Sequence, residues 1–231
     1  MPDDKGDGFS DLMRARFSTR RFKKTPVKRA ELEILMEIAR LAPSGANIQP
    51  GMIYALAGKP KNDLADALSA AFLSGDKGDE EYSYFPKPMP PHLKQRQHET
   101  GWALYGSLGI ERRDVEGRRD QHLRNYRFFD APVGLIVTID RAMGAGCYMD
   151  LGMFLQSLML AVKARGLDSC AIGALSPYHQ IVRKFVPVPD DEIVVCGMAI
   201  GYGDNSAPEN KFRTDRASVV EFTDFSRFDQ S

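Results

Sequence analysis

The sequence predicts an α+β or α/β protein in which helices cover both faces of one sheet. The segments 131–140 and 192–203 are apolar and rich in β-branched residues, which is typical of strands. Segments whose apolar residues recur at helical spacing alternate with these strands along the chain. The longest of them, 149–166, is apolar on almost every face, so we expect a central, buried helix. Such alternation usually produces a sheet that is covered on both sides.

The other elements are predicted from local signals. In ELEILMEIARLA (31–42) the apolar residues have the spacing of an amphipathic helix, and Pro43-Ser44-Gly45 ends it. The segment 74–92 has four prolines between positions 86 and 91. We expect an ordered or semi-ordered loop there, because its aromatic residues are too apolar for a solvated spacer. Further helices are expected at 61–73, 93–108, 114–127 and 177–185, and further strands at 52–58 and 167–175.

Composition argues against several classes of protein. The 231 residues are 43% hydrophobic, which suits one domain with a sizeable core, and the 31 basic and 31 acidic residues balance, which argues against bulk nucleic-acid binding. The N-terminus lacks the apolar region of a signal peptide. No stretch approaches the roughly 20 apolar residues of a membrane helix. Three widely spaced cysteines indicate reduced thiols in a cytoplasmic protein.

The sequence lacks the common motifs of self-contained active sites. It has no G-x-G-x-x-G fingerprint, no P-loop and no G-x-S-x-G nucleophile elbow. Its histidines, at positions 92, 98, 122 and 179, have no ligand spacing, so we expect no zinc or other metal site. If the protein is an enzyme, a cofactor carries the chemistry.

A basic segment near the N-terminus requires an anion. RARFSTRRF (14–22) contains four arginines, and no acidic residue occurs from Leu12 to Ala30. Within it, Arg16 and Arg20 flank two hydroxyl residues, a set that suits a phosphate, because guanidinium groups donate two parallel hydrogen bonds to its oxygens. A solvated basic face is the alternative on this evidence.

Several motifs in a fixed order resemble those of a known family. R-x-S-x-R-x-F at 16–22 is followed by a helix and by A-P-S-x-x-N-x-Q-P at 42–50. The apolar helix at 149–170, the late strand at 189–204 and the arginine-bearing tail at 207–222 complete the pattern. Together they resemble the FMN-dependent nitroreductase family over residues 12–225, and RNYRFFDAPVGLIVTIDR (124–141) resembles its nitrobenzoate-reductase-like subgroup.

The resemblance implies a three-layer α/β/α fold of the α+β class, with a mixed, mainly antiparallel central sheet flanked by helices. It implies one domain, 1–231, and a homodimer that exchanges C-terminal tails. Within the domain we expect a flexible N-terminus at 1–11, a loop-helical insertion over the active site at 74–128, and a tail at 204–231 that packs on the partner subunit.

The resemblance also implies FMN as cofactor and NADH or NADPH as reductant in a ping-pong cycle. Nitroaromatic or similar electrophilic aromatic compounds are the expected substrates. Dehalogenation or quinone reduction on the same scaffold is an alternative, as is a flavin- or nucleic-acid-binding protein without catalysis. No side chain is named as an obligatory proton donor, because the flavin N5 carries the chemistry.

The positions that match the family motifs give the residues expected to bind the flavin. Arg16 and Ser18 correspond to phosphate-binding positions, Arg20 to the position at the pyrimidine edge of the flavin, and either Arg213 or Arg216 to the tail arginine that closes on the phosphate. Phe17 stands where many members have a second arginine, so the phosphate has one fewer guanidinium partner. Gly51 stands where a tryptophan is common.

Two more segments complete the predicted site. The loop beside the flavin ring comprises Pro43, Ser44, Gly45 and Asn47, and the strand residues at its reactive edge are Ile172 and Gly173. The tyrosine- and proline-rich segment 82–105 is the candidate substrate wall, with ordinary packing as the alternative. Its proposed contact residues are Tyr84, Trp102 and Tyr105.

Overall fold

The computed structural model describes residues 8–228, and its centre is a four-stranded sheet of order β1-β2-β4-β3. Each neighbouring pair of strands is antiparallel. The one parallel pairing in the described part of the chain is an isolated bridge between Ser18 and Ser169. A mixed, mainly antiparallel sheet is therefore confirmed. The strands are β1 Gly51–Ala57, β2 Val133–Asp140, β3 Asp168–Ile172 and β4 Glu192–Gly201.

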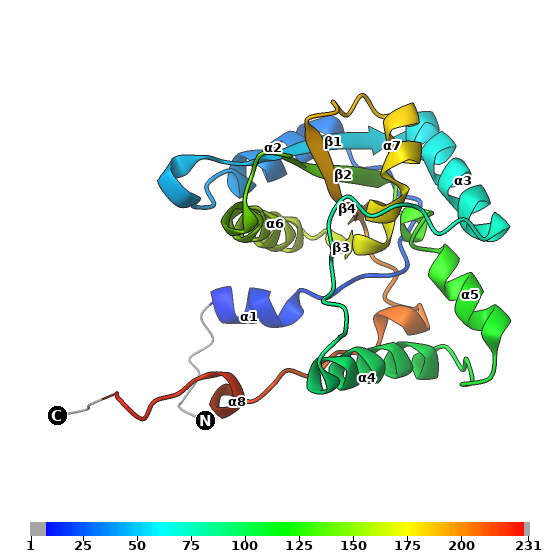
Figure 1. The fold of residues 1–231 in the computed structure, drawn as a ribbon. Coiled ribbons are helices and arrows are strands. Elements are labelled where there is room, and N and C mark those ends of the chain that lie inside the picture. Colours follow the sequence, from blue (N-terminus) through cyan, green and yellow to red (C-terminus); the bar gives the residue numbers. More distant parts are fainter. Residues whose placement is uncertain (1–7, 229–231) are drawn as a thin grey trace.

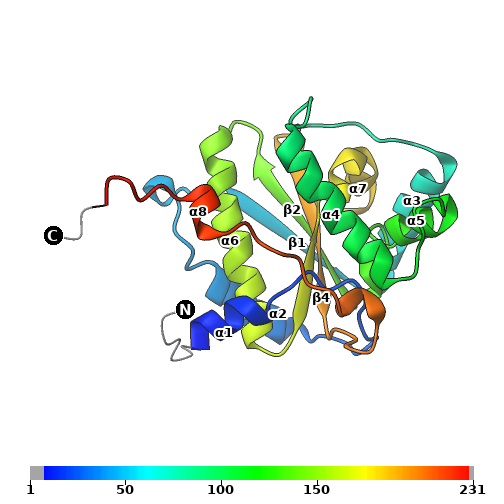
Figure 2. The same ribbon diagram turned by 90° about the horizontal axis from the view of Figure 1, so that it is seen from below.

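Helices form a layer on each side of this sheet, as Figures 1 and 2 show. On one side α2 (Arg29–Ala39) and α6 (Ala145–Ala164) bury Leu35 and Leu158 against the sheet. On the other side α3 (Gly58–Ser74) and α7 (His179–Phe185) bury Leu64 and Val182. The central strands β2 and β4 are buried almost throughout because both of their faces are covered, which explains their continuous apolar sequences.

The remaining helices lie at the margins of this core. They are α1 Gly8–Ala15, α4 Pro91–Ser107, α5 Val115–Leu123 and α8 Val219–Phe222, with short 3-10 turns at Gly45–Asn47, Phe128–Asp130, Gly173–Tyr178 and Pro208–Asn210. The predicted α4 and α5 are present. The side chain of Asp114 caps α5 by accepting a hydrogen bond from the backbone N–H of Gly117 at 2.8 Å.

Two boundary predictions were wrong. Residues 8–11, expected to be flexible, form the first part of α1, which packs on α6; residues 1–7 lie outside the described part of the chain. The strand predicted at 167–175 ends at Ile172, because Gly173–Tyr178 turns as a 3-10 helix. The apolar run 173–175 gave no signal of this turn, although Pro177 cannot supply a backbone donor to continue a strand.

The central helix α6 is less buried than its sequence indicates. By length and composition alone it is apolar enough to cross a membrane, contrary to our expectation that no stretch would be. It packs in the protein against α2, β3 and α1. Leu151, Leu158 and Val162 are buried, but Met149 is 69% exposed and most other side chains are only partly covered. Within one chain, α6 is therefore not buried on every face.

A buried carboxylate fixes the loop that precedes α4. Glu81 pairs with Arg141 at 2.5 Å and with Arg183 of α7 at 3.2 Å, and accepts a hydrogen bond from the backbone N–H of Val194 at 3.1 Å. Burial alone raises the pKa of Glu81, but these partners and the nearby His179 outweigh it and hold the pKa below its ordinary value. The loop is therefore attached to the end of β4 by a charged network.

We expect Glu81→Gln to lower the free energy of unfolding by about 2 kcal/mol at neutral pH, because each hydrogen bond to a charged group contributes about 1.5–3 kcal/mol. The depressed pKa means that the contribution of the carboxylate is present at neutral pH and is lost as the pH falls through its folded-state pKa. Chemical denaturation of parent and variant at a series of pH values should show the difference narrowing below the ordinary pKa of Glu.

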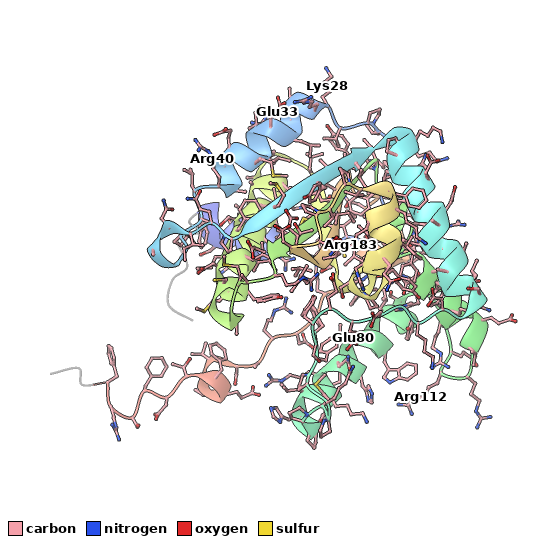
Figure 3. All side chains as sticks on the ribbon, turned by 45° about the horizontal axis from the view of Figure 1, so that its top comes forward. Lys28, Glu33, Arg40, Glu80, Arg112 and Arg183 are labelled. Atoms are coloured by element: carbon pink, nitrogen blue, oxygen red, sulfur yellow. The ribbon has the colours of Figure 1, made fainter. Side chains whose placement is uncertain are left out.

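The matched control is Glu80→Gln. Glu80 lies on the same loop, which passes Arg183 in Figure 3, and its pair with Lys87 is solvent-exposed. Exposed pairs contribute about 0–1 kcal/mol, so this variant should unfold nearly as the parent does. Equal stability of the Glu80 and Glu81 variants at neutral pH would show that the network does not hold the loop.

Candidate active site

The N-terminal basic segment and the C-terminal tail meet at one cavity of about 600 Å³. The cavity lies between α1, the segment 16–20, one side of α6 and the tail. These segments come from opposite ends of the sequence, as the blue and red parts of Figure 2 show. The lining residues are Met13, Arg14, Arg16, Phe17, Ser18, Arg20, Gln156, Phe212, Arg213, Thr214 and Arg216.

Backbone pairing with the edge strand β3 positions the basic segment. Ser18 pairs with Ser169, and the backbone N–H of Thr19 donates to the carbonyl of Ser169 at 3.1 Å. Further along, Phe22 pairs with Gly203. The extended backbone therefore runs beside β3 at Ser18 and beside the residues after β4 at Phe22. Arg16, Phe17, Ser18 and Arg20 of this segment line the cavity.

A buried asparagine attaches the tail to this segment. The side-chain oxygen of Asn210 accepts from the backbone N–H of Arg20 at 2.8 Å, and its amide nitrogen donates to the carbonyl of Arg21 at 2.8 Å. A third bond runs from the same nitrogen to the carbonyl of Asp204 at 2.9 Å. Asn210 is 4% exposed, so these bonds are shielded from water. They determine where the following arginines of the tail lie.

Four arginines of the cavity have no internal counter-ion. Within residues 8–228, none of Arg16, Arg20, Arg213 and Arg216 forms an ion pair with a carboxylate, and the side-chain bonds of the last three go to carbonyl or hydroxyl oxygens. Arg21, by contrast, points to the buried Glu209 at 3.0 Å. Within the basic segment, a buried carboxylate therefore neutralises Arg21, whereas Arg16 and Arg20 have no carboxylate partner among residues 8–228. This difference disfavours the alternative of a uniformly solvated face.

The electrostatics of the cavity favour an external anion. Burial and the positive charge of Arg216 lower the pKa of Arg16 below its ordinary value. The thiol of Cys170 lies close by, but complete burial raises its pKa despite the opposing effects of Arg20, Ser18 and Arg16, so it stays neutral. The cysteines are unpaired, as predicted, and Cys170 and Cys196 are buried. An anion entering the cavity would relieve repulsion that no carboxylate among residues 8–228 removes.

The predicted ring-side loop forms a second, smaller cavity. It has a volume of about 240 Å³ and is lined by Pro43 and Ser44 together with Asp150 and Leu151 of α6. The backbone N–H of Gly45 donates to the buried carboxylate of Asp150 at 3.2 Å. This bond fixes the loop to the N-terminal half of α6.

Internal bonds and unusual dihedral angles shape the same loop. The Ser44 hydroxyl accepts from the backbone N–H of Gln49 at 3.0 Å. Ala46, Asn47 and Gln49 all have positive φ, which an asparagine accepts more readily than most residues. The loop cavity and the arginine cavity share no lining residue. One chain therefore does not bring together the two halves of the predicted flavin site.

The third predicted segment lies under a tyrosine. Ile172 is buried at the end of β3, and Gly173 begins the following turn. A Cβ atom at Gly173 would lie 3.3 Å from the ring of Tyr84, so the ring covers the glycine backbone closely. Tyr84 itself is 59% exposed, and its ring contacts Phe85 edge-on at 4.7 Å. A glycine therefore permits close approach at this edge.

The other two proposed substrate residues lie on α4. The ring of Trp102 is 4.8 Å from the guanidinium carbon of Arg112, which Figure 3 labels beside the turn after α4, and 5.8 Å from the ring of Tyr105. Neither residue lines the arginine cavity. Their contacts are those of a surface aromatic–arginine cluster, so their role as a substrate wall remains a prediction.

Fold and cavity together define a three-layer α/β/α protein with a built site for an anionic ligand. The chain belongs to the nitroreductase family, whose sequence model matches residues 13–202. It is 38% identical to nitrobenzene nitroreductase of Ectopseudomonas oleovorans over 216 residues, 93% of this chain and 95% of that protein. It is 35% identical to 4-nitrobenzoate reductase of Pseudomonas putida over 224 residues, 97% of this chain and 98% of that protein.

Solved structures give the same result. The FMN and NADPH-dependent nitroreductase NfnB from Sphigopyxis sp. strain HMH superposes with a TM-score of 0.92 at 38% identity, covering 95% of this chain and 99% of that one. The FMN-dependent NfnB from Mycobacterium smegmatis, solved with NADPH, has a TM-score of 0.90 at 30% identity, covering 95% and 98%. The family resemblance, including the nitrobenzoate-reductase-like subgroup, is confirmed.

Sequence reasoning missed three residues that build the site. Asn210, Asp150 and Gln156 were not singled out, although each contacts or lines one of the two cavities. Asp150 had a detectable signal, because it is the one acidic residue within the apolar segment 149–166. Asn210 had none, because its role depends on contacts with a segment at the other end of the chain.

Inorganic phosphate should stabilise the ligand-free protein through the arginine cavity. A ligand at a hundred times its Kd stabilises the folded state by about 2.7 kcal/mol, so the Tm should rise with phosphate at constant ionic strength. Arg16→Gln should remove most of this rise. Arg29→Gln is the control, because Arg29 is exposed and already paired with Glu33 (Figure 3 labels Glu33). An identical phosphate response in both variants would contradict the assignment.

Proposed function

We propose that the protein is an FMN-dependent oxidoreductase that uses NADH or NADPH to reduce nitroaromatic compounds. The observation that carries this proposal is a cavity in which four of the five lining arginines form no ion pair with a carboxylate of residues 8–228. The names of its relatives, which act on nitrobenzene, chloronitrobenzene and 4-nitrobenzoate, favour a nitro group as the acceptor. Among residues 8–228 no group of His, Cys, Asp and Glu could hold a metal ion, so the proposal includes none.

The residues of the arginine cavity fit the phosphate end of FMN. Arg16 and Ser18 offer a guanidinium and a hydroxyl from the extended segment beside β3, and the tail arginines approach from the other side. A phosphate monoester carries close to two negative charges at neutral pH. Its binding would neutralise the repulsion between Arg16 and Arg216 that lowers the pKa of Arg16.

Arg20 is suited to the other end of the site. Its Nη1 donates to the carbonyl of Ser18 at 3.1 Å, and its guanidinium lies 5.7 Å from the centroid of the Phe212 ring. These contacts fix a positive charge at the inner end of the basic segment. A cation held there stabilises negative charge on the pyrimidine edge of a flavin without having to reorganise.

When bound, FMN supplies the transfer of electrons from NADH or NADPH to the aromatic acceptor. The chain supplies binding and orientation. Gly173 lets the ring of Tyr84 approach its backbone closely, and this ring shields the edge from water. The loop 43–47, held to Asp150, is proposed to cover the flavin ring. Because one face serves reductant and acceptor in turn, the kinetics should be ping-pong.

We also propose a homodimer in which each flavin site takes residues from both chains. The arginine cavity and the loop cavity lie on different parts of α6 and do not meet within one chain. The tail presents exposed apolar side chains: Val220 is 80% exposed, Phe222 71% and Phe228 67%. A monomer would leave these side chains in water, whereas a partner would cover them.

The partner surface for the tail is proposed to be the free edge of β1. Within residues 8–228 this strand pairs with β2 alone, and beside it lies a groove of about 560 Å³ between β1 and α2. Figures 1 and 2 show the tail after α8 leaving the body of its own chain. The organisation as one domain, with 74–128 over the site, belongs to this proposal. The exchanged part of the tail is limited to the residues after 216, because Asn210 and Arg213 pack on their own chain. Two buried, unpaired cysteines support a cytoplasmic location.

The purified protein should be yellow, contain about one FMN per chain, and reduce nitrobenzene or 4-nitrobenzoate with NADH or NADPH. Double-reciprocal plots should give parallel lines. Arg16→Ala should weaken FMN binding by about one to two decades, because a hydrogen bond to a charged group contributes about 1.5–3 kcal/mol. Arg20→Ala should weaken it less and lower the reduction potential of the flavin. A protein that neither contains nor binds FMN would remove the basis of this proposal.

Mixed dimers test the shared site. A chain carrying Arg16→Ala and Arg213→Ala and a chain carrying Ser44→Ala and Asn47→Ala should each have low activity as homodimers. In a mixed dimer, one of the two sites would combine the unaltered arginines of one chain with the unaltered loop of the other. Co-expression with two different affinity tags should therefore restore activity. If mixed dimers stay as inactive as both parents, each site lies within a single chain.

A further inference from the structure

Two residues from opposite ends of the sequence form a close stack in the arginine cavity. The guanidinium carbon of Arg213 lies 3.6 Å from the centroid of the Phe17 ring. This is well within the roughly 6 Å limit of a cation–π contact. A second cation, the ammonium of Lys163, lies 5.6 Å from the same centroid. The ring of Phe17 therefore stacks on the guanidinium of Arg213 from the tail, so this uncharged residue has a specific contact within the basic motif.

The same guanidinium is also fixed at one edge. Its Nη1 donates to the carbonyl of Asn210 at 2.8 Å and to that of Phe212 at 2.9 Å. These two bonds use both hydrogens of Nη1. The N–H groups of Nε and Nη2 have no acceptor among residues 8–228, and together they form the planar fork that binds carboxylate or phosphate bidentately.

Arg216 is held differently. Its Nη1 bonds only to Thr214 and Asp215, its own neighbours in the tail, and no described aromatic ring stacks on it. A guanidinium bonded only within its own short segment moves with that segment. Arg213 is instead fixed to the body of the protein through the ring of Phe17 and, by way of Asn210, through the backbone of Arg20.

We propose that Phe17 is a positioning residue for the phosphate of the cofactor. Its ring holds the plane of the Arg213 guanidinium so that the free Nε–Nη2 fork faces the cavity. This inference rests on the proposed function, and it selects Arg213 over Arg216 as the main tail ligand. It also explains how a chain with phenylalanine in place of a second arginine keeps a full set of phosphate donors: the tail supplies the cation, and the N-terminal ring orients it.

Binding of FMN and of riboflavin to the cofactor-free protein separates this role from plain packing. Phe17→Leu keeps an apolar side chain but removes the ring. It should weaken FMN binding by roughly tenfold, within the range of a desolvated cation–π contact. Riboflavin has no phosphate, so its affinity should not change. Phe17→Tyr keeps the ring and should bind FMN as the parent does.

A double-mutant cycle tests whether Phe17 acts through Arg213. In an Arg213→Gln background, Phe17→Leu should cause no further loss of FMN affinity. In an Arg216→Gln background, it should cause its full loss. If Phe17→Leu does not fold, Arg213→Lys provides the same test, because it keeps the charge but loses the planar face and the fork; it should weaken FMN binding and leave riboflavin binding unchanged.

Three results would overturn the inference: unchanged FMN affinity of Phe17→Leu, equal weakening of FMN and riboflavin, or the same loss in both arginine backgrounds. If Arg213→Lys is used instead, an FMN affinity equal to that of the parent would also overturn the inference. None of these results affects the proposed function as long as the parent protein binds FMN. Failure of the parent to bind FMN would instead refute both.

Discussion

Repulsion among Arg16, Arg20, Arg213 and Arg216 is the constraint on which the site depends. The chain brings these four cations to one cavity, and among residues 8–228 the nearby carboxylate of Glu209 pairs with Arg21 and Arg124 instead. Folding them together is unfavourable without an anion, and burial together with the positive charge of Arg216 lowers the pKa of Arg16. The contacts that offset this repulsion are not ion pairs: they are the pairing with β3, the hydrogen bonds of Asn210 and the stack of Arg213 on Phe17.

The flavin site is also linked to the proposed dimer. Helix α6 contacts both cavities, yet within one chain only part of its apolar surface is buried. The tail that carries two of the four arginines continues into exposed aromatic residues. A second chain that covers both surfaces would complete the apolar packing and the flavin site at once. Cofactor binding and dimer formation would then stabilise each other by mass action.

How much of the fold and of the site the sequence predicts depends on how far apart in the chain the contacting residues lie. The strands β2 and β4 and the helices α2 to α7 follow from local patterns, so the sequence was sufficient for them. The end of β3 at Ile172 was missed because apolar content does not distinguish a strand from a turn. The start of α1 was missed because polar content does not distinguish a short helix from a free chain end. The Phe17–Arg213 stack joins residues far apart in the chain, and no local signal predicts it.

The ³¹P NMR spectrum of FMN bound to the protein tests the central claim most directly. A free phosphate monoester takes up its second proton with a pKa of about 6, so its resonance moves between about pH 8 and pH 5. Four arginines without internal counter-ions should hold the bound phosphate as the dianion, and its resonance should stay fixed across this range. A bound resonance that titrates as free FMN does would show that the phosphate lies outside the arginine cavity.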